Sequence, residues 1–511
     1  MSKFYCLLSF LCLTFCFYSC SDDDIIENDS QEPEVPVFDI PGNKEVKFEG
    51  DDRFLIRNPC CGWGIYDDAS GEVANAETYW RDQDEAARRY ASFFYIRWRW
   101  SEMEPEEGKY AWLYDENFKK LIQGAIDRGL KLHFRVYNNS KDNLYPSTPD
   151  YVREAGAQGF MVRANTWSDV SEHWTPYIDD PIYREKFEKF IKAFAEEFDN
   201  PDIVDCYDGA SVGQWGEGND LELRDKSPQG YREALTWLTD VHKKYFKNII
   251  LLIGTGNEFG YELEKELAIN GSGYGFRCDG LGSHWHSLEL QQKLLNDYGK
   301  TLLIGESCYW GGNYQTGLRD DIKNDPVYHY NTWRDVYEAT CKQAIDQHYN
   351  TLDLRTPWET IGWMHDAPDL IQKFIVEGGY RLYPSVISFP EKVNRQQEYV
   401  LGHKWENMGN GYLPNNLPNW HYKYKIAFAL LQNGDVKKTF VDIPGDPSLI
   451  LRYSPLNSKV DVDFSDVLPG EYELGVAIVN TSKENVPEIK LAIKNIDNIN
   501  GWSKVGNIIV E

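Results

Sequence analysis

Two glutamates follow short apolar runs of the kind that form buried strands. The run that begins at residue 203, after the turn-forming segment 200–202, leads into a segment rich in Gly, Trp and acidic residues that contains Glu217. The run 301–306 ends at Glu306. Two carboxyl groups held across a cleft can act as a general acid and as a nucleophile or base, which is what cleavage of a glycosidic bond requires. We therefore expect both glutamates at strand ends and take them as the candidate catalytic pair.

The glutamates lie far apart in the sequence, so the fold has to bring them together. Strand-like runs alternate with helical patterns, which is typical of the α/β class and predicts a (β/α)8 TIM barrel. The eight predicted strands cover or begin at residues 61–66, 93–100, 130–138, 203, 249–254, 276–286, 301–306 and 351–355. The carboxyl ends of parallel barrel strands face one cleft, where the site residues of this fold collect. That arrangement favours a shared site over the alternative, in which each glutamate is a solvated or salt-bridged surface carboxylate.

Two of the predicted strands, 93–100 and 130–138, carry one polar and one apolar face by the two-residue period of a strand. In a barrel the apolar faces pack on the surrounding helices and the polar faces point inward. The polar faces therefore supply candidate substrate-binding side chains, namely Arg97, Arg99, His133, Arg135 and Tyr137.

A longer motif carries a family resemblance. Residues 97–112 read RWRWSEMEPEEGKYAW, and residues 128–132 read RGLKL. The pattern Trp-x-x-x-Glu-Pro-x-x-Gly-x-Tyr within them resembles the second-strand region of the clan A glycoside hydrolases, the β-galactosidase and cellulase superfamily. The resemblance covers roughly residues 55–370. It implies that Glu217 is the acid/base residue after the fourth strand and that Glu306 is the nucleophile at the seventh, in a retaining mechanism.

The same resemblance implies contacts to a sugar. Arg97 and His284 would flank the nucleophile, and Trp358 or Trp363 after the last strand would form the floor of the sugar site. Further candidates for substrate binding lie beside the glutamates or at the end of the sixth predicted strand, and they are Trp215, His286 and Trp310.

The chain departs from the family pattern directly before the acid/base residue. The family normally has Asn at this position, where it bonds to the sugar 2-hydroxyl, and this chain has Gly216. Gln214 or Asn219 are the candidates to replace that contact. Asp208, nearer the strand, is a competing acid, and Asp366, after the last strand, is a competing partner.

Residues 1–20 are expected to be a lipoprotein signal rather than part of the fold. The apolar run 4–18 has the length of a secretory signal and is short for a membrane span. It ends at Ser19-Cys20, which resembles the lipobox of bacterial lipoproteins, and acidic residues follow as in surface lipoproteins of glycan-degrading Gram-negative bacteria. The resemblance implies lipidation of Cys20 and an outer-membrane, cell-surface location; a cleaved signal with a chance Cys is the alternative. The acidic segment 21–40 is expected to be a disordered tether.

The amino-acid composition limits the classes of ligand and partner that the protein is expected to bind. The 511 residues include 53 Lys and Arg against 81 Asp and Glu, a net charge of −28, which argues against an electrostatic interaction with nucleic acid. The 17 Trp and 33 Tyr suit stacking on sugar rings, although most are expected in the core. The sequence contains neither a recognisable metal-ligand cluster nor a phosphate-binding glycine loop in the required context, so no cofactor or metal is expected. A carbohydrate is the expected substrate, and the oligomeric state stays open.

Beyond residue 379 the pattern changes to short alternating runs separated by Pro, Gly and Asn, which is typical of an all-β sandwich. The runs are 380–387, 398–407, 423–431, 449–453 and 472–480, with a hairpin signal at Asn433-Gly434. We expect a barrel over residues 41–378 and an accessory sandwich over 379–511. The leading hypothesis is a cell-surface glycoside hydrolase. The alternative is a non-catalytic glycan-binding lipoprotein with a degenerate barrel.

Overall fold

The computed structural model describes residues 36–67, 71–141, 145–165, 170–209, 211–255 and 258–511. The chain divides into two units, 1–39 and 40–511, and the fold described below is that of the second. The predicted signal, Cys20 and most of the predicted tether lie outside the described residues. Among the described helices, none combines the length and the apolar character that crossing a membrane demands.

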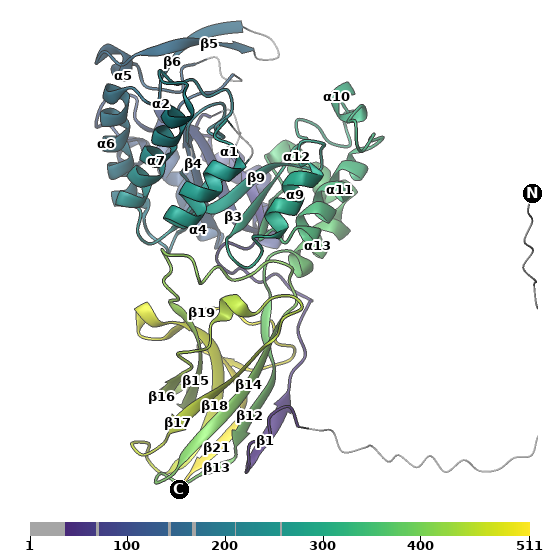
Figure 1. Ribbon diagram of the computed structural model, residues 1–511. Helices are drawn as coiled ribbons and strands as arrows, with labels where there is room; N and C mark the ends of the chain where they lie inside the picture. Colours follow the sequence, from purple (N-terminus) through teal and green to yellow (C-terminus); the bar gives the residue numbers. More distant parts are fainter. Residues whose placement is uncertain (1–35, 68–70, 142–144, 166–169, 210, 256–257) are drawn as a thin grey trace, which may run out of the picture. The chain divides into compact units, whose positions relative to one another are not determined.

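Eight parallel strands form a closed barrel (Figure 1). In chain order they are β2 (Gly62–Tyr66), β3 (Ala91–Arg99), β4 (Lys131–Tyr137), β7 (Val204–Asp208), β8 (Ile250–Gly254), β9 (Gly275–Leu281), β10 (Leu303–Ser307) and β11 (Thr351–Asp353). Each strand pairs with the next along the chain, and β11 pairs with β2 to close the barrel. The predicted barrel is confirmed, and each of its strands overlaps a predicted run.

Helices alternate with the barrel strands. The longer ones are α1 (Ala76–Arg89), α4 (Glu116–Asp127), α6 (Pro181–Phe198), α7 (Pro228–Tyr245), α9 (Leu288–Leu295), α11 (Trp333–Asp346), α12 (Pro357–Asp366) and α13 (Pro368–Glu377). Short helices are α2 (Trp100–Met103), α3 (Ala111–Tyr114), α5 (Asp150–Glu154), α10 (Asp320–Lys323) and α8 (Tyr261–Glu264), which continues as a π-helix over Lys265–Asn270. Side-chain oxygens cap many of the longer helices at their N-termini, because the first backbone N–H groups lack partners within the helix. These caps are Asn75, Asp115, Asp180, Ser227, Ser287 and Thr332.

The two faces of β3 have the predicted roles. Phe94, Ile96 and Trp98 are fully buried in the apolar core that the barrel shares with its helices. The opposite face carries Tyr95, which lies in a small aromatic cluster with Tyr66 and Phe93, and then Arg97. An antiparallel hairpin of β5 (Gly159–Asn165) and β6 (Val170–Pro176), which was not predicted, is inserted between β4 and α6.

The C-terminal segment forms two packed sheets. One has the order β1 (Asn43–Lys47), β12 (Leu382–Pro390), β14 (Glu398–Asn407) and β17 (Leu456–Asp463). The other contains β13 (Lys392–Val393), β21 (Trp502–Val510), β18 (Gly470–Asn480), β15 (Tyr424–Gln432) and β16 (Asp435–Val441), with β19 (Val486–Ile489) and β20 (Asn498–Ile499) at its side. The predicted sandwich is consistent with these sheets, and the predicted hairpin joins β15 to β16.

Two details differ from the expected pattern. Strand β1 precedes the barrel in the chain and yet pairs with β12, so the sandwich draws one strand from the N-terminal side. Residues 449–453 form no strand, because the chain there makes a 3-10 turn at Pro447–Leu449 and a local bridge between Leu451 and Ser454.

The sandwich closes the amino-terminal end of the barrel. Ile250 and Leu302, near the starts of their strands, share one buried apolar cluster with Leu417 and Trp420 of the sandwich segment. The side-chain amide of Asn419 also donates to the Ile249 carbonyl at 2.5 Å. Because this end is covered, the carboxyl ends of the strands are left to form the site.

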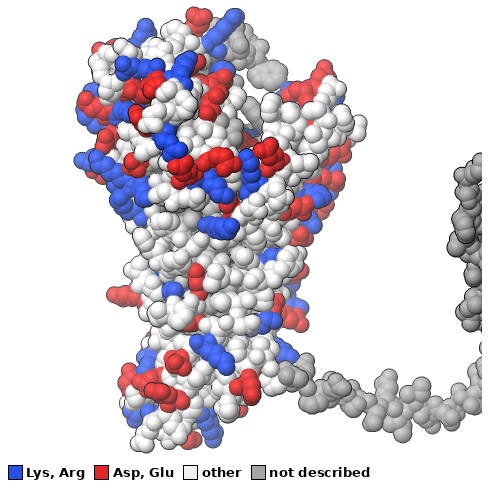
Figure 2. Space-filling model, in the orientation of Figure 1, with Lys and Arg blue, Asp and Glu red and all other residues white. Residues whose placement is uncertain are grey.

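The face drawn in Figure 2 mixes acidic and basic side chains, and blue and red atoms alternate along it. On the described residues of this face no broad cationic area forms, which agrees with the net charge of −28. A polyanion such as nucleic acid would meet acidic groups among the basic ones on this face.

Candidate active site

The two glutamates reach the site from different kinds of backbone. Glu306 lies near the end of β10, as predicted. Glu217 does not end a strand: β7 stops at Asp208, and Glu217 lies further along, in the loop that follows. The prediction for Glu217 was wrong because this loop is a series of tight turns, with positive φ at Trp215 and at Gly216.

Gly216 gives this loop its position. Its φ is +76°, and a Cβ there would lie 2.8 Å from Cβ of Tyr137 on β4. Only glycine meets both conditions, since other residues adopt this conformation at a cost and would also clash. The departure from the family pattern before Glu217 therefore has a physical reason. It leaves the backbone of the loop packed directly against β4.

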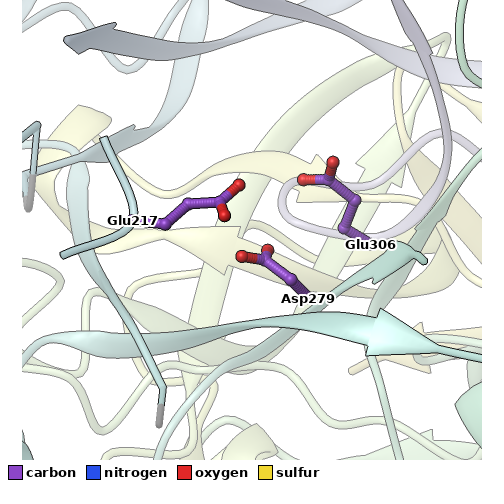
Figure 3. A group of neighbouring side chains, drawn as sticks. All are labelled: Glu217, Asp279 and Glu306. Atoms are coloured by element: carbon purple, nitrogen blue, oxygen red, sulfur yellow. The ribbon is translucent and has the colours of Figure 1, made fainter. Parts of the chain in front are cut away.

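Three carboxyl groups converge at the carboxyl ends of the strands. Glu217, Glu306 and Asp279, which β9 contributes, each place one oxygen within 4.8 Å of the other two. Figure 3 shows the three carboxyls turned toward a common point. The side chains of Glu217 and Glu306 are 11% and 4% exposed, whereas that of Asp279 is 34% exposed. We call these three residues the carboxyl cluster.

Four buried arginines surround the carboxyl cluster, and we call them the arginine group. They are Arg97 on β3, Arg135 on β4, Arg277 on β9 and Arg355 just after β11. Arg135 donates to Glu217 at 2.7 Å and to Asp208 at 2.9 Å. Asp208, which the sequence suggested as a competing acid, thus lies fully buried beneath Glu217 as a partner of Arg135.

Glu306 is held by two members of the arginine group. Arg277 forms ion pairs with both Glu306 and Asp279. Nη1 of Arg355 lies 2.5 Å from Oε1 of Glu306, and its Nε lies 3.1 Å from Asp353. Two cations in contact with one carboxylate favour its ionised form.

Arg97 stands between the two glutamates. Its Nη1 is 3.9 Å from Oε1 of Glu217 and 4.0 Å from Oε1 of Glu306, so it is too far from either for a good hydrogen bond. A ligand oxygen that entered this space would find a buried guanidinium within reach. Arginine is well suited to such a role because it stays charged and offers several donors.

Aromatic rings lie next to the arginine group. The guanidiniums of Arg135 and Arg277 lie 5.7 and 5.4 Å from the ring centre of Tyr95. Arg355 lies 5.2 Å from the ring of Tyr66 and 5.8 Å from that of Trp310. Trp310 is 38% exposed, so part of its ring is accessible to a ligand, and its stacking on a sugar stays a prediction.

The surroundings give the carboxyl groups different acidities. Burial, together with the charge of Asp279, raises the pKa of Glu217 to about 7, although Arg135, Arg277 and Arg97 act in the opposite direction. Burial also disfavours the charged form of Asp279, but Arg277 and Arg135 outweigh it and lower the pKa of that group. Burial raises the pKa of a carboxyl group because it disfavours the charged form. At pH 6 the proton therefore resides mainly on Glu217.

The oxygens of the carboxyl cluster are close enough to share a divalent cation. The four guanidiniums already compensate these carboxylates, however, and they would repel a further cation. The arrangement therefore favours acid and nucleophile chemistry over a metal centre.

Three of the other predicted residues belong to the loop that carries Glu217. Asn219 donates from Nδ2 to Oε2 of Glu217 at 3.4 Å, and the carbonyl of Trp215 accepts from Arg135 at 3.3 Å. Gln214 is fully buried, and its Oε1 accepts from the backbone N–H of Lys141. Of the two candidates for a contact to the sugar, the structure leaves only Asn219 next to the acid.

Four predicted residues lie away from the carboxyl cluster. His133 stacks on Phe93 at 3.9 Å between ring centres, with only 1% exposed. Arg99 pairs with Glu102 at 2.5 Å. The remaining two are histidines: Nδ1 of His284 lies 3.0 Å from Asp325, and Nδ1 of His286 lies 3.4 Å from Sγ of Cys278.

The sequence pattern predicted a strand over residues 276–286, with His284 and His286 at its end. That predicted strand is too long. Strand β9 ends at Leu281, so its inward-facing residues at the rim are Arg277 and Asp279. His284, which the family resemblance places beside the nucleophile, lies beyond the end of this strand and bonds to Asp325 instead. Arg277 and Arg355 occupy that role instead.

The tryptophans proposed for the sugar floor differ in burial. Trp363 is 1% exposed and packs in the core against Trp63 at 5.1 Å and Tyr337 at 4.2 Å between ring centres. Trp358 is 41% exposed at the start of α12. Asp366 pairs with its neighbour His365 at the other end of α12, so it has no place in the carboxyl cluster.

Trp363→Ala is expected to lower the free energy of unfolding by about 3–5 kcal/mol, because it opens a large cavity in the core. Trp358→Ala is expected to change it by no more than about 0.5 kcal/mol, as is usual for exposed positions. Urea denaturation of both variants measures the difference. Equal effects would contradict the assignment of Trp363 to the core.

Comparison with known proteins gives a limited picture. No protein-family model and no curated protein matches this chain. Among solved structures, endo-glycoceramidase II from Rhodococcus sp. matches with a TM-score of 0.38 and 12% identity, over 82% of this chain and 99% of that chain. A glycoside hydrolase family 5 enzyme from Prevotella bryantii has a TM-score of 0.38 and 13% identity, over 64% and 99%. A xylanase from Cellvibrio japonicus has a TM-score of 0.39 and 14% identity, over 58% and 86%. Similarity this low carries no argument about activity, and we draw none from it.

Proposed function

We propose that the chain is a retaining glycoside hydrolase that acts on a poly- or oligosaccharide at the cell surface. One observation carries this proposal: Glu217 and Glu306 bring oxygens within 4.8 Å of each other at the carboxyl end of the barrel. Retaining enzymes hold their two carboxyl groups about 5–5.5 Å apart, whereas inverting enzymes leave about 6.5–9.5 Å for a water. Oxygens that approach within 4.8 Å are compatible with the retaining spacing, and on this basis we propose direct attack by one carboxylate.

In the first step, Oε of Glu306 attacks the anomeric carbon as its bond to the leaving oxygen breaks. Glu217 gives its proton to that oxygen, so the leaving group departs as a neutral alcohol. The product is a glycosyl ester on Glu306, and Glu217 is left as a carboxylate. In the second step Glu217 takes a proton from water, the water oxygen attacks the anomeric carbon, and the ester bond to Glu306 breaks.

The surrounding groups support this division of roles. A carboxyl with a pKa of about 7 keeps its proton in neutral and mildly acidic solution and is a suitable acid. Arg277 and Arg355 favour ionised Glu306, which a nucleophile requires. Arg97 is the group we expect to bond to a sugar oxygen, and Trp310 is the ring we expect to stack on the sugar.

A second candidate function is a non-catalytic glycan-binding barrel. The observation that favours it is the pairing of Glu306 with two buried guanidiniums, since attack on a sugar requires at least one oxygen of Glu306 to be free. Buried ion pairs also serve purely structural purposes.

The experiment that separates the two functions is a panel of aryl glycosides and oligosaccharides, with both product release and binding measured. We expect hydrolysis of at least one member by the wild type. Binding of a glycan without hydrolysis of any member, by the wild type and by Glu306→Gln alike, would favour the non-catalytic function.

We also propose that the protein is exported and anchored to the outer membrane through Cys20. The basis is the apolar run before this residue and the acidic residues after it. Cys20→Ala is expected to move the protein from the membrane fraction to the soluble fraction, because a lipid chain supplies most of the attachment. Cys16→Ala, within the same apolar run, is the matched control and should stay in the membrane fraction. Unchanged membrane association of Cys20→Ala would overturn the anchor.

A further inference from the structure

We infer that Asp279 is a positioning residue that keeps a proton on Glu217 and so extends bond cleavage from acidic to neutral solution. The inference rests on the proposed function for the role of Glu217, but the sharing of the proton does not. Asp279 was not among the residues that the sequence suggested, and its contribution arises from the arrangement of the carboxyl cluster.

Glu217 and Asp279 form a close pair of carboxyl groups. Glu217 and Asp279 face each other, one from the loop after β7 and the other from β9 (Figure 3). Each of the two carboxyl groups places an oxygen within 4.8 Å of an oxygen of the other. Two carboxylates this close repel each other when both are ionised, so one of them retains a proton.

The surroundings decide which group retains it. Asp279 forms an ion pair with Arg277, its neighbour on the same face of β9, and is 34% exposed to solvent. Glu217 is 11% exposed and has one close cation, Arg135. A solvated and paired carboxyl ionises first, and the more buried partner keeps the proton.

Most of the other charged groups around the pair favour the ionised form of Glu217. Charged groups face the pair from six of the surrounding barrel strands or their ends, namely Arg97, Arg135, Asp208, Arg277, Glu306 and, after β11, Arg355. Four of these groups are guanidiniums, which favour an ionised Glu217. The pKa of Glu217 is nevertheless raised, first by burial and then by Asp279. Asp279 is therefore the nearby charge that offsets the arginine group.

The direct test is a titration of the Glu217 carboxyl, in which ¹³C NMR of protein labelled at the glutamate carboxyl carbons monitors its protonation. Glu217→Gln identifies the signal by removing it. In the wild type we expect a midpoint near pH 7. In Asp279→Asn the midpoint should fall by at least about one pH unit, since the like charge is gone and the arginines remain. Asp279→Glu keeps the negative charge, so the Glu217 midpoint in this variant should lie close to the wild-type value.

The control is Asp366→Asn, because Asp366 pairs with His365 outside the carboxyl cluster. It should leave the Glu217 midpoint unchanged. Asp279→Ser is a second neutral variant, to be used if Asp279→Asn does not fold. An unchanged Glu217 midpoint in a folded neutral variant would overturn the inference.

Activity gives a second readout. The loss of kcat/KM at high pH follows the proton on Glu217, so its midpoint in Asp279→Asn should move to lower pH by the same amount as the NMR midpoint. A lowered NMR midpoint without hydrolysis by any variant would support the shared proton and refute the proposed function. Hydrolysis with the same pH profile in wild type and Asp279→Asn would refute the role of Asp279 and leave the proposed function standing.

Discussion

Glu306→Gln is expected to lower kcat/KM by about 10⁴-fold or more, the scale of loss seen when a catalytic nucleophile is removed. The amide has nearly the shape of the carboxylate, but it cannot form the glycosyl ester. Glycan binding, measured by calorimetry, should persist, since Arg97 and Trp310 are unchanged. Rate measurements on the best substrate of the panel test the prediction.

The matched control is Glu338→Gln on α11, where an exposed glutamate pairs with Arg334. This variant should keep wild-type activity. Because Glu306→Gln also removes a negative charge between Arg277 and Arg355, circular dichroism has to show that the variant folds. A folded Glu306→Gln protein with activity within tenfold of wild type would contradict the assignment of the nucleophile.

Glu217→Gln is expected to lower kcat/KM by about 10²- to 10⁴-fold on substrates with a poor leaving group, the range typical of a lost general acid. Aryl glycosides with a very acidic phenol need little protonation, so their first step should be nearly unaffected. The fall in activity above about pH 7 should also disappear, because wild-type Glu217 is protonated below its pKa of about 7 and loses the proton above it.

Measurements of kcat/KM across a range of pH, on one substrate with a poor leaving group and one with an acidic phenol, check this prediction. The control is again Glu338→Gln, which should keep the wild-type pH profile. If Glu217→Gln lost activity equally on both kinds of leaving group, Glu217 would not be the acid, and Asp279 would be the next candidate.

The strands of the barrel were predictable because each is a short apolar run between turn residues. Strand β10, for example, consists of buried apolar residues followed by Glu306, so the strand and the end of the strand coincide in the pattern. The short strand β1, in contrast, reads Asn-Lys-Glu-Val-Lys and has no apolar period. Its pairing with β12 depends on residues more than three hundred positions away, and local pattern contains no such information.

The conformation of the loop that carries Glu217 could not be predicted from the local sequence, for a related reason. Its turns depend on positive φ at Trp215, which is unusual for a large side chain, and on the close approach of Gly216 to Tyr137. A single sequence reveals neither the strain nor the neighbour. The sequence correctly placed the competing residue Asp208 nearer the strand. In the structure Asp208 ends β7 and accepts a hydrogen bond from Arg135, beneath the site.

The arginine group was found only in part, although a signal for it existed. Arg277 and Asp279 alternate with Phe276 and Cys278, the same alternation that identified Arg97 and Arg135. The run was interpreted as continuing to residue 286, whereas the strand ends at Leu281, between Gly280 and Gly282, which both have positive φ. Which arginine pairs with which carboxylate depends on contacts across the barrel, and spacing along one strand cannot supply them.

The most direct test of the account is covalent trapping. A 2-fluoro glycosyl fluoride of the sugar that the panel identifies slows hydrolysis of the glycosyl enzyme, and peptide mass mapping locates the bound sugar. We predict one sugar on the peptide that contains Glu306, together with product of retained anomeric configuration in ordinary turnover. A sugar attached to any other residue, or product of inverted configuration, would contradict the assignment of Glu306 as nucleophile.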